Sequence, residues 1–196
     1  MSRPRIYLVR HGETDWNLAG RLQGGKDIPL NDLGREQAVT SARVIQEMDR
    51  DPGRLFYVSS PLQRTAGTMA ILRATLGLRP DDFARDDRFR EIRYGRWEGM
   101  SWPELRRREP ENLAVRDADP WNFVAPDGES FAMLSMRVLP ALAELKQDSV
   151  VVTHGGVVRV VLHALAGMPA AEAAELPVRQ GAVYVVGEGG FELAIP

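Results

Sequence analysis

The sequence predicts an α/β fold, a three-layer sandwich in which helices flank a mostly parallel sheet. Short β-prone apolar runs, each followed by a polar loop and then by a helical segment, occur three times along the chain. The chain has 196 residues, of which 44% are hydrophobic and 27% charged. This length and composition are typical of one globular domain with a sizeable core, so we expect a single domain over residues 1–196.

The first unit begins with residues 6–9, an Ile-Tyr-Leu-Val run that predicts a buried strand ending in a polar loop. Apolar side chains recur at helical spacing after Asn31, so a helix is expected to begin near this residue. Asn31 or Asp32 is its candidate N-cap. The stretch Asp51-Pro52-Gly53 ends this helix, since proline cannot continue it.

The second and third units repeat this order. Residues 55–58 predict a strand, and residues 63–76 predict a helix that Gly77 closes. Residues 149–153 are β-branched and predict another strand, followed by an apolar helix over residues 157–166.

Three more elements complete the expected sheet and its helical layers. A helix is expected over residues 130–145. Residues 182–186 and 191–195 predict two short strands, joined as a hairpin around residues 187–190.

The middle of the chain, at about residues 79–128, is richer in charge, tryptophan, proline and glycine, and its periodicity is weak. We interpret it as an insertion that covers the active site. Within it, Ser101 and Glu104 fit a capping box with a proline between them, which predicts a short helix to about Arg108.

Charge and cysteine usage exclude several classes of function. The formal net charge of −2 gives no overall attraction to nucleic acid or to an anionic membrane. The absence of cysteine excludes disulfides, thiolate metal sites and cysteine nucleophiles. The apolar run at residues 6–9 is too short for a signal peptide, and no run approaches the ~20 residues that span a bilayer. We therefore expect a cytoplasmic protein without a nucleic-acid or membrane partner, and its oligomeric state stays open.

Polar residues gather where the three predicted parallel strands end. The first strand leads into Arg10 and His11, the second into Ser59 and Ser60 and then Arg64, and the third into His154. Ligands of open α/β sheets bind beyond the carboxyl ends of the strands, so these residues should meet in one crevice.

These residue types suit the transfer of a phosphoryl group. Arg10 and Arg64 can supply bidentate donors to its charged oxygens, and His154, if protonated, a further donor. His11 is the candidate nucleophile, since a neutral imidazole with one nitrogen fixed by a backbone carbonyl can attack phosphorus in line. Glu91 fits a general acid that protonates the leaving oxygen and then, as a base, activates water. The scheme requires no metal and no cofactor.

Five segments carry a resemblance to a known family. They are Arg10-His11-Gly12-Glu13-Thr14, Asn17 with Arg21, Ser60-Pro61-Leu62-Gln63-Arg64-Thr65, the stretch from Arg90 to Gly99 with Glu91, and Thr153-His154-Gly155-Gly156. In this order they resemble the histidine phosphatase superfamily, the phosphoglycerate mutase-like proteins, over nearly the whole chain.

The resemblance implies a phosphoglycerate mutase-like fold and a role for each matched position. His11 is the implied site of phosphorylation, Glu91 the proton donor and acceptor, and His154, Arg10 and Arg64 the phosphate pocket. Asn17 and the backbone of Gly24 and Gly155 are implied to add contacts to the phosphoryl group. Tyr94 falls in register with the family's pattern after Glu91 and is a further candidate for substrate binding.

The resemblance leaves the reaction open between two activities. Hydrolysis of small phosphate monoesters is favoured, because the segment between Glu91 and His154 is shorter than in the cofactor-dependent phosphoglycerate mutases and lacks their paired arginines. The Tyr-Gly-x-Trp-Glu-Gly form also resembles α-ribazole phosphatases and broad-specificity phosphatases. Phosphoglycerate mutase is the main alternative. A regulator that binds phosphorylated ligands without catalysis is a further one, against which the intact motif residues count.

The residues also allow four other interpretations. Glu98 is the nearby rival of Glu91 as the acid. Residues 20–26 begin like a nucleotide-binding P-loop, but Asp27 occupies the Ser/Thr position, and adjacent arginines disfavour zinc at the two histidines. The eight arginines within residues 85–108 are hypothesised to bind a second anionic group of the substrate.

Overall fold

A six-stranded sheet forms the centre of the molecule in the computed structural model, which describes residues 4–188 and 190–195. The strand order is β3-β2-β4-β1-β5-β6, and the first four strands of this order run parallel. β5 and β6 add antiparallel pairs at one side. The strands are β1 (Ile6–Arg10), β2 (Phe56–Ser59), β3 (Ala84–Arg85), β4 (Ser149–Thr153), β5 (Val183–Gly187) and β6 (Gly190–Ala194).

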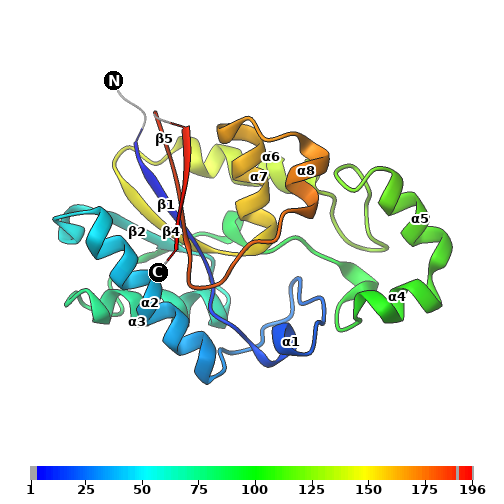
Figure 1. Ribbon diagram of the computed structural model, residues 1–196, viewed down its shortest axis with the longest axis horizontal. Coiled ribbons are helices and arrows are strands. Elements are labelled where there is room, and N and C mark those ends of the chain that lie inside the picture. The colour runs from blue at the N-terminus through cyan, green and yellow to red at the C-terminus, as the bar shows by residue number, and fades with distance from the viewer. Residues whose placement is uncertain (1–3, 189, 196) are drawn as a thin grey trace.

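Helices cover both faces of this sheet (Figure 1). On one face, α2 (Asp32–Met48) and α3 (Gln63–Thr75) bury Ile45 and Leu72 against the strands. On the other face lie α6 (Phe131–Ala143), α7 (Gly155–Ala166) and α8 (Ala170–Glu175), shown in yellow to orange. The predicted three-layer α/β fold with a mostly parallel sheet is confirmed.

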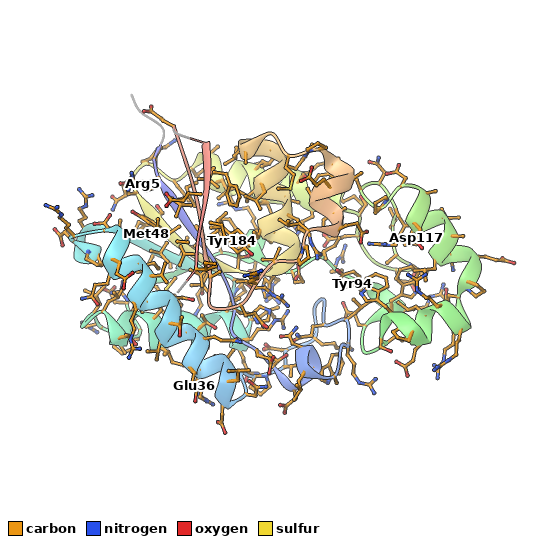
Figure 2. The ribbon with its side chains drawn as sticks, in the orientation of Figure 1. Arg5, Glu36, Met48, Tyr94, Asp117 and Tyr184 are labelled. Carbon is orange, nitrogen blue, oxygen red and sulfur yellow. The ribbon has the colours of Figure 1, made fainter. Side chains whose placement is uncertain are left out.

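The segment at residues 79–128 contributes to more than one part of the fold. Its start pairs with the sheet as β3, while α4 (Trp102–Arg108) and α5 (Pro110–Ala118) lie apart from the sheet at one side of the molecule (Figure 1). These helices enclose a small core of their own, made of Trp97, Leu105, Leu113 and Ala125. Tyr94 packs against both this core and the core of α6 and α7, and Figure 2 labels it between the two parts. That the segment is an insertion covering the active site stays a prediction.

Several local predictions are confirmed by the capping contacts. Asn31 caps α2, because its side chain accepts a hydrogen bond of 2.9 Å from the Gly34 N–H. Ser101 and Glu104 form the predicted capping box of α4. The strand at residues 149–153 has the predicted bounds, whereas α7 begins at Gly155, two residues earlier than predicted.

The sequence did not predict β3, α5 or α8, nor the short α1 (Asp15–Leu18). Residue 189, inside the predicted hairpin turn, lies outside the described residues. Within the part of the chain that is described, every helix is too short or too polar to cross a membrane. The remaining elements are 3-10 turns at Pro52–Arg54, Asp87–Phe89 and Gly95–Trp97.

Candidate active site

A cavity of about 520 Å³ lies beyond the carboxyl ends of β1 and β4, where the three predicted strand ends meet. Eight of the nine residues predicted for the site line it directly, and the ninth, His154, places its ring centroid 5.2 Å from that of His11. The eight are Arg10, His11, Asn17, Gly24, Arg64, Glu91, Tyr94 and Gly155.

His11 follows the last residue of β1 and is buried, with 2% of its surface exposed. Its Nδ1 lies 2.7 Å from the Gly12 carbonyl oxygen. A carbonyl only accepts, so Nδ1 carries the proton and Nε2 keeps its lone pair. Burial, followed by the charges of Arg64 and Arg10, holds the pKa of His11 well below 6.5. The ring is therefore a neutral imidazole at neutral pH, as a nucleophile requires.

His154 ends β4 at the N-cap position of α7 and is fully buried. Its Nε2 lies 2.8 Å from the Ser60 Oγ, a contact that joins the ends of β4 and β2. Burial, and next the charge of Arg64, hold the pKa of His154 well below 6.5. The sequence analysis gave His154 as a donor if protonated, but the isolated protein holds this ring neutral. A neutral ring donates through one nitrogen only, and Nδ1 is that donor in the tautomer in which Nε2 accepts from the Ser60 hydroxyl.

Two guanidinium groups are tied to backbone carbonyls around these rings. Arg64, on the first turn of α3, donates to the carbonyls of Lys26 and Gly24 at 2.6 and 2.9 Å. Arg10 donates from Nη1 to the Val178 carbonyl at 2.7 Å. Burial lowers the pKa of Arg64 to about 10 and also lowers the pKa of Arg10, yet both remain cations at neutral pH. Their orientation is fixed before any ligand arrives.

Three buried nitrogens at this point lack a partner among the described residues. They are Arg10 Nε, Arg64 Nε and His154 Nδ1. A buried donor without a partner costs about 1 to 3 kcal/mol, and more when it belongs to a charged group. Such donors, gathered around the free Nε2 of His11, form a site that an anion with several oxygens would satisfy.

The Glu91 carboxylate lies beside Gly155, where a Cβ would be 3.9 Å from its Oε2, and it is held by backbone donors. Its Oε1 accepts from the N–H groups of Ile92 and Gly156 at 2.9 and 3.0 Å. Glycine at position 156 leaves room for the carboxylate in this place, because a Cβ would lie 2.4 Å from Oε1. No described residue hydrogen-bonds to Oε2, so this oxygen is available to a substrate.

Glu98, the rival of Glu91, has a different role. Its Oε1 accepts from the Gly25 N–H at 2.8 Å and lies where a Cβ of Gly24 would be. Gly24 also has a φ of +51°, which favours glycine. Glu98 thus shapes the loop whose carbonyls hold Arg64. Among the described residues, Glu98 is not one of those that line the cavity.

A partly buried ion pair supports the segment that carries Glu91, and the sequence did not predict it. Arg137 on α6 donates from Nη1 to the carbonyls of Arg88 and Arg90 and from Nη2 to that of Glu91. The same guanidinium pairs with Glu129 at 3.0 Å. The backbone of residues 88–91 is therefore clamped by one side chain.

Gly12 packs against the backbone of α2. A Cβ at this position would lie 2.0 Å from the Gly34 carbonyl oxygen, so glycine is needed for the packing of the loop against α2. Asn17 keeps the predicted place in the cavity. Its Oδ1 accepts from Thr14 and Gln180, while its Nδ2 makes no hydrogen bond to the residues described.

Comparison with known proteins places this site in a family context. The family model of the histidine phosphatase superfamily, branch 1, matches residues 6–194. The chain is 37% identical over 179 residues to a glucosyl-3-phosphoglycerate phosphatase of Mycolicibacterium vanbaalenii, covering 84% of this chain and 75% of that protein. It is 34% identical to phosphoserine phosphatase 1 of Hydrogenobacter thermophilus, covering 84% and 77%. Among solved structures, a mycobacterial glucosyl-3-phosphoglycerate phosphatase in complex with VO3 superposes with a TM-score of 0.82 at 30% identity and covers 98% of each chain.

Proposed function

The chain belongs to the histidine phosphatase superfamily, and on this premise we propose that it hydrolyses small phosphate monoesters through a phosphohistidine intermediate on His11. One observation carries the proposal. Three buried nitrogens, on Arg10, Arg64 and His154, have no hydrogen-bond partner among the described residues, and they lie at the same site as the His11 imidazole, whose Nδ1 is fixed by a carbonyl. The names of the relatives, both phosphatases of small phosphorylated molecules, support the same activity.

The first step transfers the phosphoryl group to the protein. The nitrogens of Arg10, Arg64 and His154 bind the non-bridging oxygens and stabilise the charge that spreads over them in the transition state. Nε2 of His11 attacks phosphorus, and the bond from phosphorus to the ester oxygen breaks. Glu91 in its acid form gives its proton to that oxygen, so the product leaves as an alcohol.

The second step regenerates the enzyme. Glu91, now a carboxylate, removes a proton from a water molecule as the water oxygen attacks phosphorus. The bond from phosphorus to Nε2 breaks and inorganic phosphate forms, while Glu91 is again in its acid form. Asn17, Gly24, Tyr94 and Gly155 line the cavity around this reaction and add binding contacts.

The segment at residues 79–128 supplies part of the cavity wall in this proposal. Trp97, Trp102 and Phe123 from this segment line the cavity that His11 also lines. This supports the interpretation of the segment as an insertion over the active site within a single domain. The net charge of −2 and the size of the cavity favour a small phosphate ester over nucleic acid as the partner, and we place the protein in the cytoplasm.

Hydrolysis of p-nitrophenyl phosphate tests the proposal. We expect His11→Ala to abolish turnover, and His163→Gln to retain it, because His163 contacts Trp121 and the Met168 carbonyl outside the cavity. Brief reaction with a labelled ester should leave acid-labile, base-stable phosphate on the wild-type protein and none on His11→Ala. Turnover should persist in EDTA. Full activity of His11→Ala would refute the role of His11, and loss in EDTA would refute the metal-independent scheme.

The mutase alternative is decided by the same protein with 3-phosphoglycerate as substrate. Release of inorganic phosphate without formation of 2-phosphoglycerate would identify a phosphatase. Isomerisation that outpaces hydrolysis would identify a mutase with the same five core residues. Binding without either reaction would favour the regulatory alternative.

A further inference from the structure

Six arginines line the cavity, and they differ in whether a carboxylate balances their charge. Arg21 pairs with Glu104, Arg106 with Asp117, and Arg116 with both Asp117 and Glu175. The other three, Arg10, Arg64 and Arg159, form no salt bridge within residues 4–188 and 190–195. A cation that faces a cavity without a counter-charge is a candidate for anion binding.

Arg10 and Arg64 are already assigned to the phosphoryl group, which leaves Arg159. This residue is partly buried and lies on α7, four positions after Gly155 and therefore on the same helix face. Its Nε donates to the Leu176 carbonyl at 3.0 Å, and its guanidinium carbon lies 5.9 Å from the centre of the Phe131 ring. Its two terminal nitrogens make no hydrogen bond to any described residue. The side chain is thus held in place with both terminal donors available.

The same short segment anchors Arg159 and Arg10. Arg159 is bound to the Leu176 carbonyl and Arg10 to the Val178 carbonyl. An extended chain advances about 3.3 Å per residue, so the two anchors lie roughly 7 Å apart. After burial, the charge of Arg159 is among the influences that lower the pKa of Arg10, which agrees with two cations facing one space. A ligand that bears two negative groups on a short carbon chain would relieve this repulsion.

We propose that Arg159 is a specificity-determining residue that binds a carboxylate of the substrate while Arg10 and Arg64 bind its phosphoryl group. The inference rests on the proposed function and narrows its substrates to phosphate monoesters that also carry a carboxylate. With Nε occupied by Leu176, the two terminal nitrogens match the two oxygens of a carboxylate in a bidentate pair.

This assignment replaces the hypothesis that arginines within residues 85–108 hold a second anion. Of those eight arginines, only Arg106 is among the described residues that line the cavity, and it is balanced by Asp117. Arg88, the most strongly paired, binds Asp86 and Glu144 instead.

The test compares two esters that differ only in the carboxylate, 3-phosphoglycerate and glycerol 1-phosphate, with p-nitrophenyl phosphate as a third. We expect Arg159→Gln to lower kcat/KM for 3-phosphoglycerate by about 10- to 100-fold, the range of a charged hydrogen-bonded pair. The other two esters should be hydrolysed as by wild type. Arg106→Gln is the matched control, since it removes a cavity arginine that already has a partner, and it should leave all three unchanged.

Equal loss on all three esters, or no loss on 3-phosphoglycerate, would overturn the role of Arg159. Failure of the proposed function is distinguishable, because wild type would then hydrolyse none of the esters. Calorimetric binding to the inactive His11→Ala protein decides the role of Arg159 even in that case. Addition of Arg159→Gln to His11→Ala should weaken the binding of 3-phosphoglycerate and leave that of glycerol 1-phosphate unchanged. Equal affinities of the single and the double variant for 3-phosphoglycerate would refute the inference.

Discussion

Replacement of Gly156 by alanine should displace the proposed general acid and leave the phosphoryl pocket intact. The new Cβ would lie 2.4 Å from Glu91 Oε1, 3.1 Å from Ile92 Cγ2 and 3.3 Å from Leu134 Cδ2. The two apolar neighbours belong to the packed core, so the carboxylate is the group that gives way. Since ordinary contacts begin at 3.4 Å, Oε1 has to retreat by about 1 Å, and its 3.0 Å hydrogen bond to the Gly156 N–H is lost.

A misplacement of 1 Å can cost a catalytic group about 100-fold in rate. We therefore expect kcat/KM of Gly156→Ala to fall by about 100-fold for glycerol 1-phosphate, whose leaving alkoxide needs a proton. For p-nitrophenyl phosphate the fall should be much smaller, because this leaving group departs without protonation. The ratio kcat/KM is the appropriate quantity, because it reports the steps up to the phosphorylated enzyme and excludes the later action of Glu91 as a base.

Gly67→Ala is the matched control, because it makes the same change in a helix where the Cβ meets only the Leu30 side chain at 3.4 Å. Gly67→Ala should keep or raise Tm, since alanine is favoured over glycine in helices by about 1 kcal/mol. In Gly156→Ala this gain is offset by the lost hydrogen bond of the Gly156 N–H, so its Tm should lie at or below that of the wild type. Equal losses of Gly156→Ala on the two esters, or full activity on glycerol 1-phosphate, would refute the reasoning.

Three further predictions follow from the same contacts. Glu91→Gln should lose more kcat/KM on alkyl than on aryl phosphates, and an equal loss would indicate a positioning role. Arg137→Met should lower the free energy of unfolding by about 2 kcal/mol in urea titration, because Glu129 is left without its partner; adding Glu129→Gln should recover part of this, and no recovery would contradict the account. Stability should fall from pH 7 to pH 5, because the lowered pKa values of His11 and His154 keep them neutral when folded, whereas the unfolded chain protonates them near pH 6.5. The slope is limited to about 1.4 kcal/mol per pH unit for each histidine, and a His11→Asn/His154→Asn variant should show a shallower slope; an unchanged slope would contradict the assignment.

The sequence predicted those parts of the fold whose signals are local. The Asn31 cap and the box of Ser101 and Glu104 are short-range hydrogen bonds, so their residues suffice to find them. α5 was missed because it has nine residues, is polar on average and buries only Leu113, so it carries too short an apolar pattern to be recognised. α8 has six residues, and its side chains provide no cap.

The site residues at strand ends were predictable because parallel strands bring their carboxyl ends together. Contacts that depend on tertiary packing were not. Gly12 packs against the Gly34 backbone, 22 positions away along the chain, and no local pattern indicates this contact. Arg159 escaped notice on an apolar helix, although its spacing of four from Gly155 places it on the cavity side.

The small core around Trp97 makes this phosphatase separable into a constant and a variable part. Within the segment at residues 79–128, Phe89, Ile92 and Trp121 belong to the main core, whereas Leu105 of α4 and Leu113 of α5 pack in the small core. Exchange of residues 102–118 for helices of different shape would therefore change the part of the cavity lined by Trp102, Arg106 and Arg116. Glu91, the histidines and their strands lie outside the exchanged residues, so this joint is the place at which to engineer new substrate ranges.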